Sequence, residues 1–170
     1  WDISAPPFGD RWVLDNFQKH SYPLGIMVNL DGKRFVDEGE DYRNLTYVKF
    51  GKVIMGQPHR TAVQIFDQKT VHRLRDEYRI KQVTRVEAGT IGELAQKLEI
   101  DATALEATVS AYNAACQPGD YNPSVLDGVP ARGVMQLERH ADAAAAARQP
   151  QHHARRVGRA AVVHGADAER

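Results

Sequence analysis

Short runs of apolar residues, rather than one long periodic stretch, organise the first half of the chain. The runs 25–30 and 33–36 flank Asp31-Gly32, a dipeptide typical of a hairpin turn because both central positions need a positive φ. A third run, 62–66, predicts another strand, and 83–86 is a further candidate. We therefore expect a β-hairpin with short additional strands.

Helical spacing of apolar residues and suitable capping residues predict about four helices. Asp41, Asp67 and Asp101 are candidate N-caps, and Thr90 and Glu93 form a capping box. The expected helices span 41–55, 67–78, 90–98 and 101–115. Because helices and short strands follow each other in mixed order, the predicted fold class is α+β.

The two ends of the chain differ from this pattern. Residues 1–24 contain Pro6, Pro7 and Gly9 and no periodic element, so we expect an irregular lead-in to a domain at 25–132. Residues 131–170 contain twelve Ala, seven Arg and four His and carry a net charge of +3. They lack an apolar stripe, so we predict that a tail at 133–170 is disordered or weakly helical.

Charge and cysteine content exclude several function classes. The chain has 22 basic and 22 acidic residues, and this zero net charge argues against a strongly basic nucleic-acid binder. No apolar run approaches the roughly 18 residues that cross a bilayer. The single cysteine, Cys116, excludes a disulfide framework and a cysteine-based zinc cluster. It also favours a reducing compartment, so we expect a cytoplasmic location.

Motifs of common enzyme classes are absent from the chain. It contains no glycine-rich phosphate loop, no H-E-x-x-H and no nucleophile elbow. His152-His153 has no third ordered ligand beside it, so no metal site is expected. His20, next to Lys19, is the histidine whose segment can face a cleft, and an ordinary surface histidine is the alternative.

Two arginines flank a cluster of acidic residues. Arg34 precedes the cluster and Arg43 follows it, and its members are Asp37, Glu38, Glu40 and Asp41. An arginine in this setting can be an ion-paired surface residue. It can also lie in a closed site, where it binds an anionic substrate through two hydrogen bonds or passes a proton. Charge spacing alone leaves both interpretations open.

The segment 25–38, GIMVNLDGKRFVDE, resembles the hallmark stretch that opens the capping domain of the fumarate reductase/succinate dehydrogenase flavoprotein superfamily. The continuation 39–51 is most similar to the tricarballylate dehydrogenase branch, as are 17–24 and 106–113. The resemblance extends from residue 1 to about residue 132.

This resemblance implies an FAD-dependent oxidoreductase that interconverts C–C single and double bonds in a small polycarboxylate such as tricarballylate or fumarate/succinate. Hydride would pass at flavin N5, and Lys19 and His20 would bind the substrate. The family's proton-transfer position matches Tyr42 by strict spacing and Arg43 with a one-residue insertion. We expect Arg43, because a tyrosine would need a far larger pKa shift for this role. No part of the chain matches the family's FAD-binding domain. We therefore expect a cap-domain fragment, inactive and without bound FAD by itself, whose tail is a frameshifted sequence.

Two alternatives stay open at this stage. A stand-alone, non-enzymatic binding module would use the arginine-rich tail to bind nucleic acid or an acidic partner, although a net charge of +3 is small for that purpose. A cap from a 3-ketosteroid dehydrogenase-like flavoenzyme would close over a neutral substrate. The positive residues at 19, 20 and 43 favour a carboxylate instead.

Overall fold

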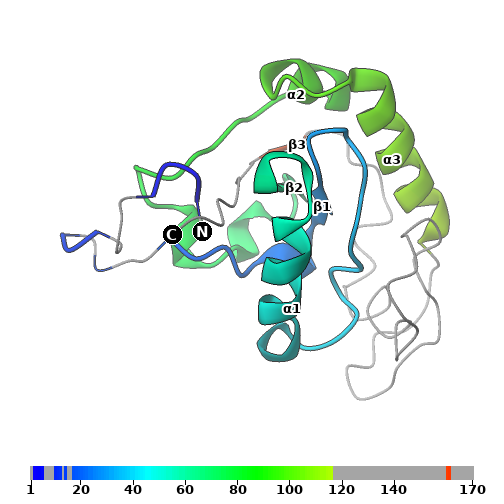
Figure 1. Ribbon diagram of the computed structural model, residues 1–170. Helices are drawn as coiled ribbons and strands as arrows, with labels where there is room; N and C mark the ends of the chain where they lie inside the picture. The colour runs from blue at the N-terminus through cyan, green and yellow to red at the C-terminus, as the bar shows by residue number, and fades with distance from the viewer. Residues whose placement is uncertain (1, 6–9, 13, 15–16, 117–159, 162–170) are drawn as a thin grey trace.

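The computed structural model describes residues 2–5, 10–12, 14, 17–116 and 160–161 (Figure 1). A three-stranded antiparallel sheet in the order β1-β2-β3 lies at its centre. Its strands are β1 (Ile26–Val28), β2 (Val63–Asp67) and β3 (Ala160–Ala161). Within the predicted tail, only Ala160 and Ala161 are described, as β3, and the rest of that prediction lies outside the described residues.

Three α-helices accompany the sheet: α1 (Arg43–Met55), α2 (Ile91–Lys97) and α3 (Ala102–Ala115). Four 3-10 helices connect them: η1 (Tyr22–Leu24), η2 (Pro58–Arg60), η3 (Val71–Arg73) and η4 (Asp76–Tyr78). This combination of helices with a small antiparallel sheet confirms the α+β prediction. Among the described residues, no helix combines the length and the apolar character needed to cross a membrane.

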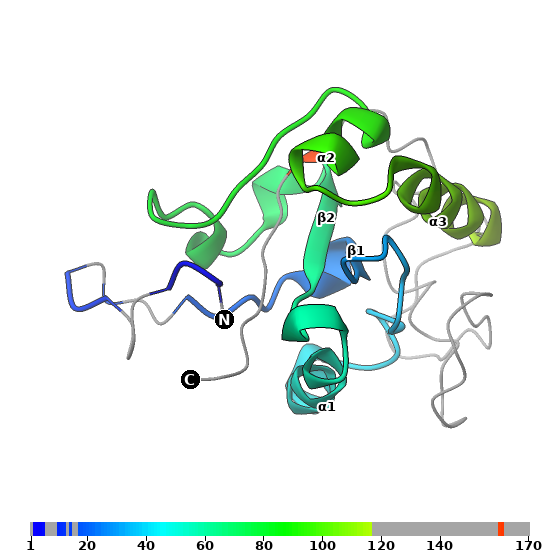
Figure 2. The same cartoon turned by 45° about the horizontal axis from the view of Figure 1, so that its top comes forward.

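The two faces of the sheet pack against different helices (Figure 2). Ile26, Val28 and Ile65 belong to a core cluster that also contains residues of α2 and α3. Met27 points the other way, because side chains alternate along a strand, and joins Phe50 and other residues of α1 in a second cluster. The sheet therefore separates α1 from the α2–α3 pair.

The predicted turn at residues 31–32 forms, but the strand expected after it does not. Gly32 has φ +70°, and its N–H donates to the carbonyl of Asn29 over 3.0 Å. Beyond the turn, Arg34 makes a single bridge to Val28. The carboxylate of Glu38 accepts the N–H of Met27, so a side chain takes a position that a second hairpin strand would otherwise fill. The strand paired with β1 is β2.

Helix starts confirm two of the predicted caps. Thr90 Oγ1 accepts the N–H of Glu93 over 3.1 Å, and Asp101 Oδ1 accepts that of Ala104 over 2.6 Å. The prediction of Asp41 as a cap was wrong by one residue. Tyr42 is the N-cap of α1 and provides no side-chain hydrogen bond there.

The expected helix at 67–78 was also wrong, because η3 and η4 replace it. Leu74 and Tyr78 pack on Phe66, and Ser21 Oγ accepts the N–H of Arg75 between the two 3-10 turns. These tertiary contacts interrupt the helical path. Residues 83–86 are described but do not form the strand that was predicted for them. The carboxylate of Asp2 accepts the N–H of Thr84 instead.

Candidate functional site

Arg43 is the first residue of α1, and its side chain meets His20 from the segment before β1. Arg43 Nη1 lies 3.0 Å from His20 Nδ1, and Nη2 donates to Asn44 Oδ1 over 2.6 Å. The hydroxyl of Tyr22 donates to the Arg43 carbonyl over 3.2 Å and so ties the start of α1 to η1. Of the three residues predicted for the site, the structure brings Arg43 and His20 together.

The contact with Arg43 determines the tautomer of His20. A guanidinium can only donate, so Nδ1 must be the acceptor and Nε2 carries the hydrogen of the neutral ring. Burial lowers the pKa of His20, and the charge of Arg43 lowers it further. The ring also packs on Tyr47, with 5.5 Å between ring centroids. His20 is therefore a neutral imidazole that orients Arg43 without neutralising its charge.

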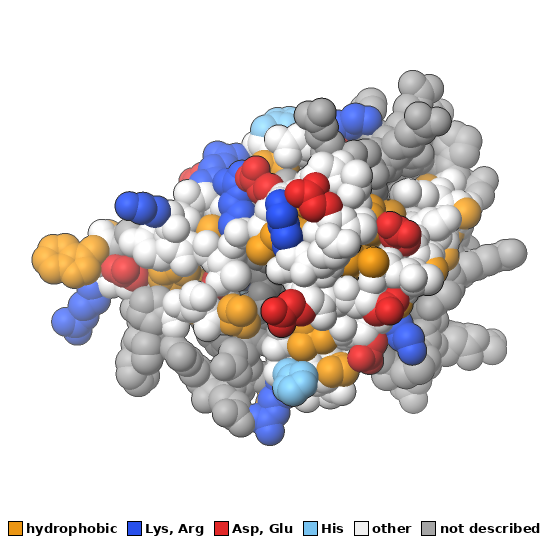
Figure 3. Space-filling view, turned by 90° about the horizontal axis from the view of Figure 1, so that it is seen from above, with side chains coloured by type: hydrophobic (Ala, Val, Ile, Leu, Met, Phe, Trp, Pro, Cys, Tyr) orange, Lys and Arg blue, Asp and Glu red, His pale blue; other side chains and the backbone are white. Residues whose placement is uncertain are grey.

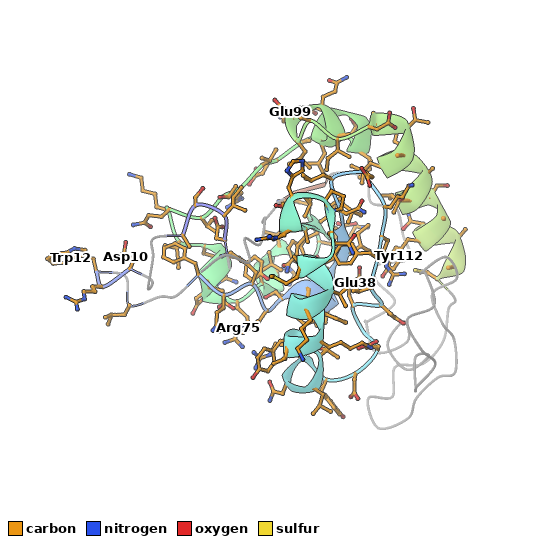
Figure 4. The ribbon with its side chains drawn as sticks, viewed as in Figure 1. Asp10, Trp12, Glu38, Arg75, Glu99 and Tyr112 are labelled. Carbon is orange, nitrogen blue, oxygen red and sulfur yellow. The ribbon has the colours of Figure 1, made fainter. Side chains whose placement is uncertain are left out.

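Arg34, the other arginine next to the acidic cluster, has a different environment. Its Nε donates to Glu38 Oε2 over 2.8 Å, its Nη2 pairs with Glu38 and Asp37, and its guanidinium lies 4.9 Å from the ring centroid of Tyr112. Figure 4 shows Glu38 and Tyr112 on the α3 side of the molecule. These buried interactions tie the turn region to α3, so Arg34 stabilises the fold.

Arg43 has no carboxylate partner among the described residues. The acidic residues near the start of α1 are engaged elsewhere. Glu40 pairs with Lys49 over 2.7 Å, and Asp41 accepts the N–H of Tyr42 over 2.6 Å. A half-buried guanidinium with neutral neighbours retains its positive charge for an anionic ligand.

Lys19, the third residue predicted for the site, is directed elsewhere. Its Nζ donates to the Glu77 carbonyl over 2.8 Å and lies 3.8 Å from the Asp2 carboxylate. It also lies 5.0 Å from the centroid of Tyr78. Only 4% of its side chain is exposed. The Lys19 ammonium therefore holds the lead-in segment against η4, away from the Arg43 guanidinium.

A pocket of about 380 Å³ lies beside His20, between α1 and the segment 18–22, and Arg43 is not among the residues that line it. His20 and Tyr47 line it together with Met27, Phe50 and Ile54. Sequence reasoning missed Tyr47, although it follows Arg43 by four residues and so shares its face of the helix. Lys19, which the sequence did single out, also lines the pocket. The remaining lining residues carry no sequence signal, because the segment 18–22, β1, α1 and β2 bring them together.

The described residues do not fit a dinucleotide cofactor. An FAD pyrophosphate is held where a glycine-rich turn joins a parallel strand to a helix, whereas β1 and β2 are antiparallel. The tight turn after β1 contains Gly32, yet a Cβ there would lie 3.0 Å from the backbone nitrogen of Leu105. Gly32 is therefore packed directly against the start of α3. Among the described residues, no three His, Cys, Asp or Glu side chains form a group that could hold a metal ion.

Acidic and basic side chains are interspersed on the surface around α2 and α3 (Figure 3). Two ion pairs lie at or beside η4, Arg75–Glu77 and Arg79–Asp76. Two more lie before and within α2, Arg85–Glu87 and Lys97–Glu93. Such mixed charge provides no extended field of one sign for a polyanion. Within the described residues, the uncompensated charge at Arg43 is thus the more specific feature.

Comparison with known proteins gives a likeness among solved structures. No protein-family profile matches the chain, and no curated protein matches it. Among solved structures, a flavocytochrome c3 fumarate reductase in its open conformation matches with a TM-score of 0.52 and 23% sequence identity over 87% of this chain. The match covers 22% of that protein's chain. At this identity, the likeness shows a common fold.

Proposed function

We propose that the chain is the capping part of an FAD-dependent oxidoreductase that acts on a C–C bond of a small polycarboxylate such as tricarballylate or fumarate/succinate. The observation that carries this proposal is the pairing of Arg43 with a neutral His20, with no carboxylate beside it in the described residues. The fold shared with a segment of a flavocytochrome c3 fumarate reductase supports it. The resemblance of residues 25–51 to the family's hallmark stretch supports it as well.

Arg43 would have two tasks in this reaction. Its guanidinium can bind a substrate carboxylate through two parallel hydrogen bonds, which fixes the orientation of the substrate. It can also exchange a proton with the substrate carbon, as the resemblance implies for this position. Nδ1 of His20 accepts a hydrogen bond from Nη1 and Asn44 accepts one from Nη2, so both ends of the guanidinium are oriented.

The oxidation half of the reaction requires a flavin that the described residues do not hold. It would come from a separate FAD-binding part of a longer polypeptide. Closure of this α+β unit over that part would exclude water from the carboxylate and from Arg43. In that arrangement, the buried cluster around Arg34 and Glu38 would keep the start of α1 in position.

The test begins with the gene sequence that flanks this coding region. A flanking G-x-G-x-x-G strand–turn–helix segment is expected, and the longer polypeptide should bind flavin and oxidise tricarballylate or succinate with a dye acceptor. Arg43→Gln should lower kcat by at least about 100-fold, within the range typical of lost general acid–base catalysis. The exposed Arg73→Gln is the matched control and should leave kcat unchanged. Full activity of Arg43→Gln would refute the role of Arg43.

A further inference from the structure

Helix α1 presents an apolar stripe to solvent, on the face opposite its buried residues. The stripe consists of Leu45, Val48 and Met55, which are 68%, 53% and 46% exposed. Together with the exposed Lys52 they have the spacing i, i+3, i+7, i+10, which places side chains on one face of a helix. Figure 2 shows α1 at the lower edge of the molecule, with no other described helix on its outer side. The stripe is therefore accessible to a partner.

Exposed apolar side chains are concentrated on this helix. In the described part of the chain, eight large hydrophobic side chains are exposed, and five of them belong to α1 or its N-cap: Tyr42, Leu45, Tyr47, Val48 and Met55. A single exposed apolar residue needs no explanation, whereas a group of them on one element is typical of an interaction surface.

The pocket of about 380 Å³ adjoins the stripe, because Val48, Lys52 and Met55 also line it. The buried Met27 and Phe50 form part of its wall. Its volume lies near the lower end of the range for pockets that bind small organic molecules. In protein interfaces, pockets lined by apolar side chains receive the anchor residues that contribute most to affinity. The pocket therefore suits one apolar anchor of a partner that lies along the stripe.

The charge of this surface is positive. Residues 42–61 contain four Lys and Arg residues and no Asp or Glu. Lys49 is paired with Glu40 over 2.7 Å, whereas Lys52 has no carboxylate partner within the residues that the structure describes. A partner that complements this surface offers negative charge next to apolar side chains.

This combination of charge and shape distinguishes three kinds of occupant. A second copy of the chain would bring the cations of one α1 against those of the other, because the helix contains no acidic residue. An anionic lipid surface matches the charge, but lipid takes up the convex apolar face of a helix and would leave the concave pocket unfilled. An acidic, amphipathic peptide segment matches both the charge and the pocket.

We propose that the outer face of α1 docks an acidic, amphipathic segment of a partner protein, with an apolar side chain of the partner in the pocket and a carboxylate of the partner at Lys52. Arg43 does not line this pocket. Twelve positions separate Arg43 from Met55, which is about 18 Å along the helix axis. The proposal goes beyond the oxidoreductase function and does not rest on it, since neither Arg43 nor a flavin takes part.

The experiment selects binders from a phage-displayed library of random peptides, with the full 170-residue chain as the target. We expect the selected peptides to be rich in Asp and Glu and to share an aromatic or large aliphatic residue. The tightest of them, made synthetically, should shift the backbone amide NMR signals of residues 45–55 and bind more weakly as the salt concentration rises. No enrichment, or enrichment of basic or uncharged peptides, would overturn the proposal.

Two variants locate the binding surface. Lys52→Glu reverses the charge at the pocket, and Gly51→Leu extends a side chain into it, at a position where a Cβ meets no atom within 4 Å. Each should weaken binding of the tightest peptide at least about tenfold. Lys81→Glu is the matched control, because it makes the same charge change at an exposed lysine that does not line the pocket. Unchanged affinity in Lys52→Glu or Gly51→Leu, or an equal loss in Lys81→Glu, would refute the proposed surface.

Two further measurements test the other occupants. A dimer in analytical ultracentrifugation that Val48→Glu dissociates would show that a second copy covers the stripe. Binding to phosphatidylglycerol vesicles that Val48→Glu abolishes and the acidic peptide does not displace would show that a lipid surface covers it. We expect neither result, and either one would overturn the proposal. None of these measurements involves the FAD-dependent activity.

Discussion

Nη1 of Arg43 and Nδ1 of His20 lie 3.0 Å apart, although 23 positions separate the two residues in the sequence. The contact joins the start of α1 to the segment that precedes β1. Because the guanidinium can only donate, it fixes the imidazole as an acceptor at Nδ1. The two predicted site residues therefore form one chemical unit, and its state can be measured without any substrate.

Replacement of Arg43 by glutamine should raise the pKa of His20. Burial lowers this pKa below 6.5 and the positive charge of Arg43 lowers it further, so removing the charge removes the second cause. An NMR titration of the imidazole signals measures the change, and in the unmodified chain nitrogen shifts should report the Nε2–H tautomer. Arg75→Gln is a comparison, since Arg75 has a smaller effect on His20. An unchanged pKa in Arg43→Gln would contradict the contact.

The buried ion pair between Arg34 and Glu38 should be strongly coupled. Their side chains are 9% and 1% exposed, so Arg34→Met leaves a buried carboxylate without its cation and should cost about 3–5 kcal/mol of unfolding free energy. Glu38→Gln keeps an acceptor for the N–H of Met27 while removing the charge. Urea denaturation of both single variants and the double variant measures the coupling.

In this double-mutant cycle, the double variant should lose less than the sum of the two single losses, by about 1 kcal/mol or more. The reason is that Arg34→Met no longer leaves a buried charge when residue 38 is glutamine. Lys49→Met, which removes the cation from the more exposed Lys49–Glu40 pair, should cost less than about 1 kcal/mol. Strict additivity of the two buried substitutions would disprove the coupling.

Asp37 should make the chain less stable as the pH rises. Burial outweighs the neighbouring Arg34 and raises the Asp37 pKa from 3.8 to about 7, so the folded chain holds this proton more tightly than the unfolded chain does. The resulting contribution is complete below pH 3.8 and is lost as the pH rises to about 7. Asp37→Asn should remove this dependence.

At pH 8, Asp37→Asn should therefore be more stable than the unmodified chain, by on the order of 1 kcal/mol. The two should be similar near pH 4. Unfolding by urea at pH 4, 6 and 8 measures the difference, and Asp76→Asn is the control because the Asp76 side chain is 98% exposed. A loss of stability at pH 8 in Asp37→Asn would show that the Asp37 carboxylate is needed in its charged form.

Replacing Gly25 and Gly51 with alanine should change the stability of the chain in opposite directions. At Gly25, a Cβ would lie 2.2 Å from the carbonyl oxygen of Ile65 and 2.7 Å from Phe66 Cδ1. Gly25→Ala must therefore displace β1 from β2 and should cost about 2 kcal/mol or more. Gly51→Ala adds a methyl group in open space on a helix and should stabilise the chain by about 0.5–1 kcal/mol. Thermal unfolding of both variants tests the pair.

The hydroxyl of Tyr78 should contribute to stability through two buried hydrogen bonds. It donates to Gln64 Oε1 over 2.7 Å and accepts the N–H of Ser21 over 2.8 Å. Tyr78→Phe leaves both of those groups without this partner and should cost about 1–3 kcal/mol. Tyr47→Phe, at an exposed position, is the control and should change unfolding by less than about 0.5 kcal/mol. Equal effects of the two substitutions would contradict this role.

Local chemistry allowed several elements to be predicted from the sequence. The caps Thr90 and Asp101 act within three residues of themselves, so the starts of α2 and α3 could be inferred from residue types alone. The Asp31-Gly32 turn depends on one positive φ. The structure of the segment 67–78 could not be predicted in this way, because a residue distant in the sequence, Ser21, accepts one of its backbone N–H groups.

The same division applies to the candidate site. Spacing and capping were enough to predict the α+β class and the starts of α2 and α3. Arg43 was chosen from the family resemblance and His20 from its place next to Lys19, and both stay predictions as site residues. The folded structure was needed to show that Arg34 is buried with carboxylates while Arg43 is not, and that the Lys19 ammonium donates to the Glu77 carbonyl. It also formed the pocket from α1, β1 and the segment 18–22. The partners of a charged side chain and the walls of a pocket come from residues that are far apart in the sequence and close in space. A local sequence pattern does not report which distant residues meet.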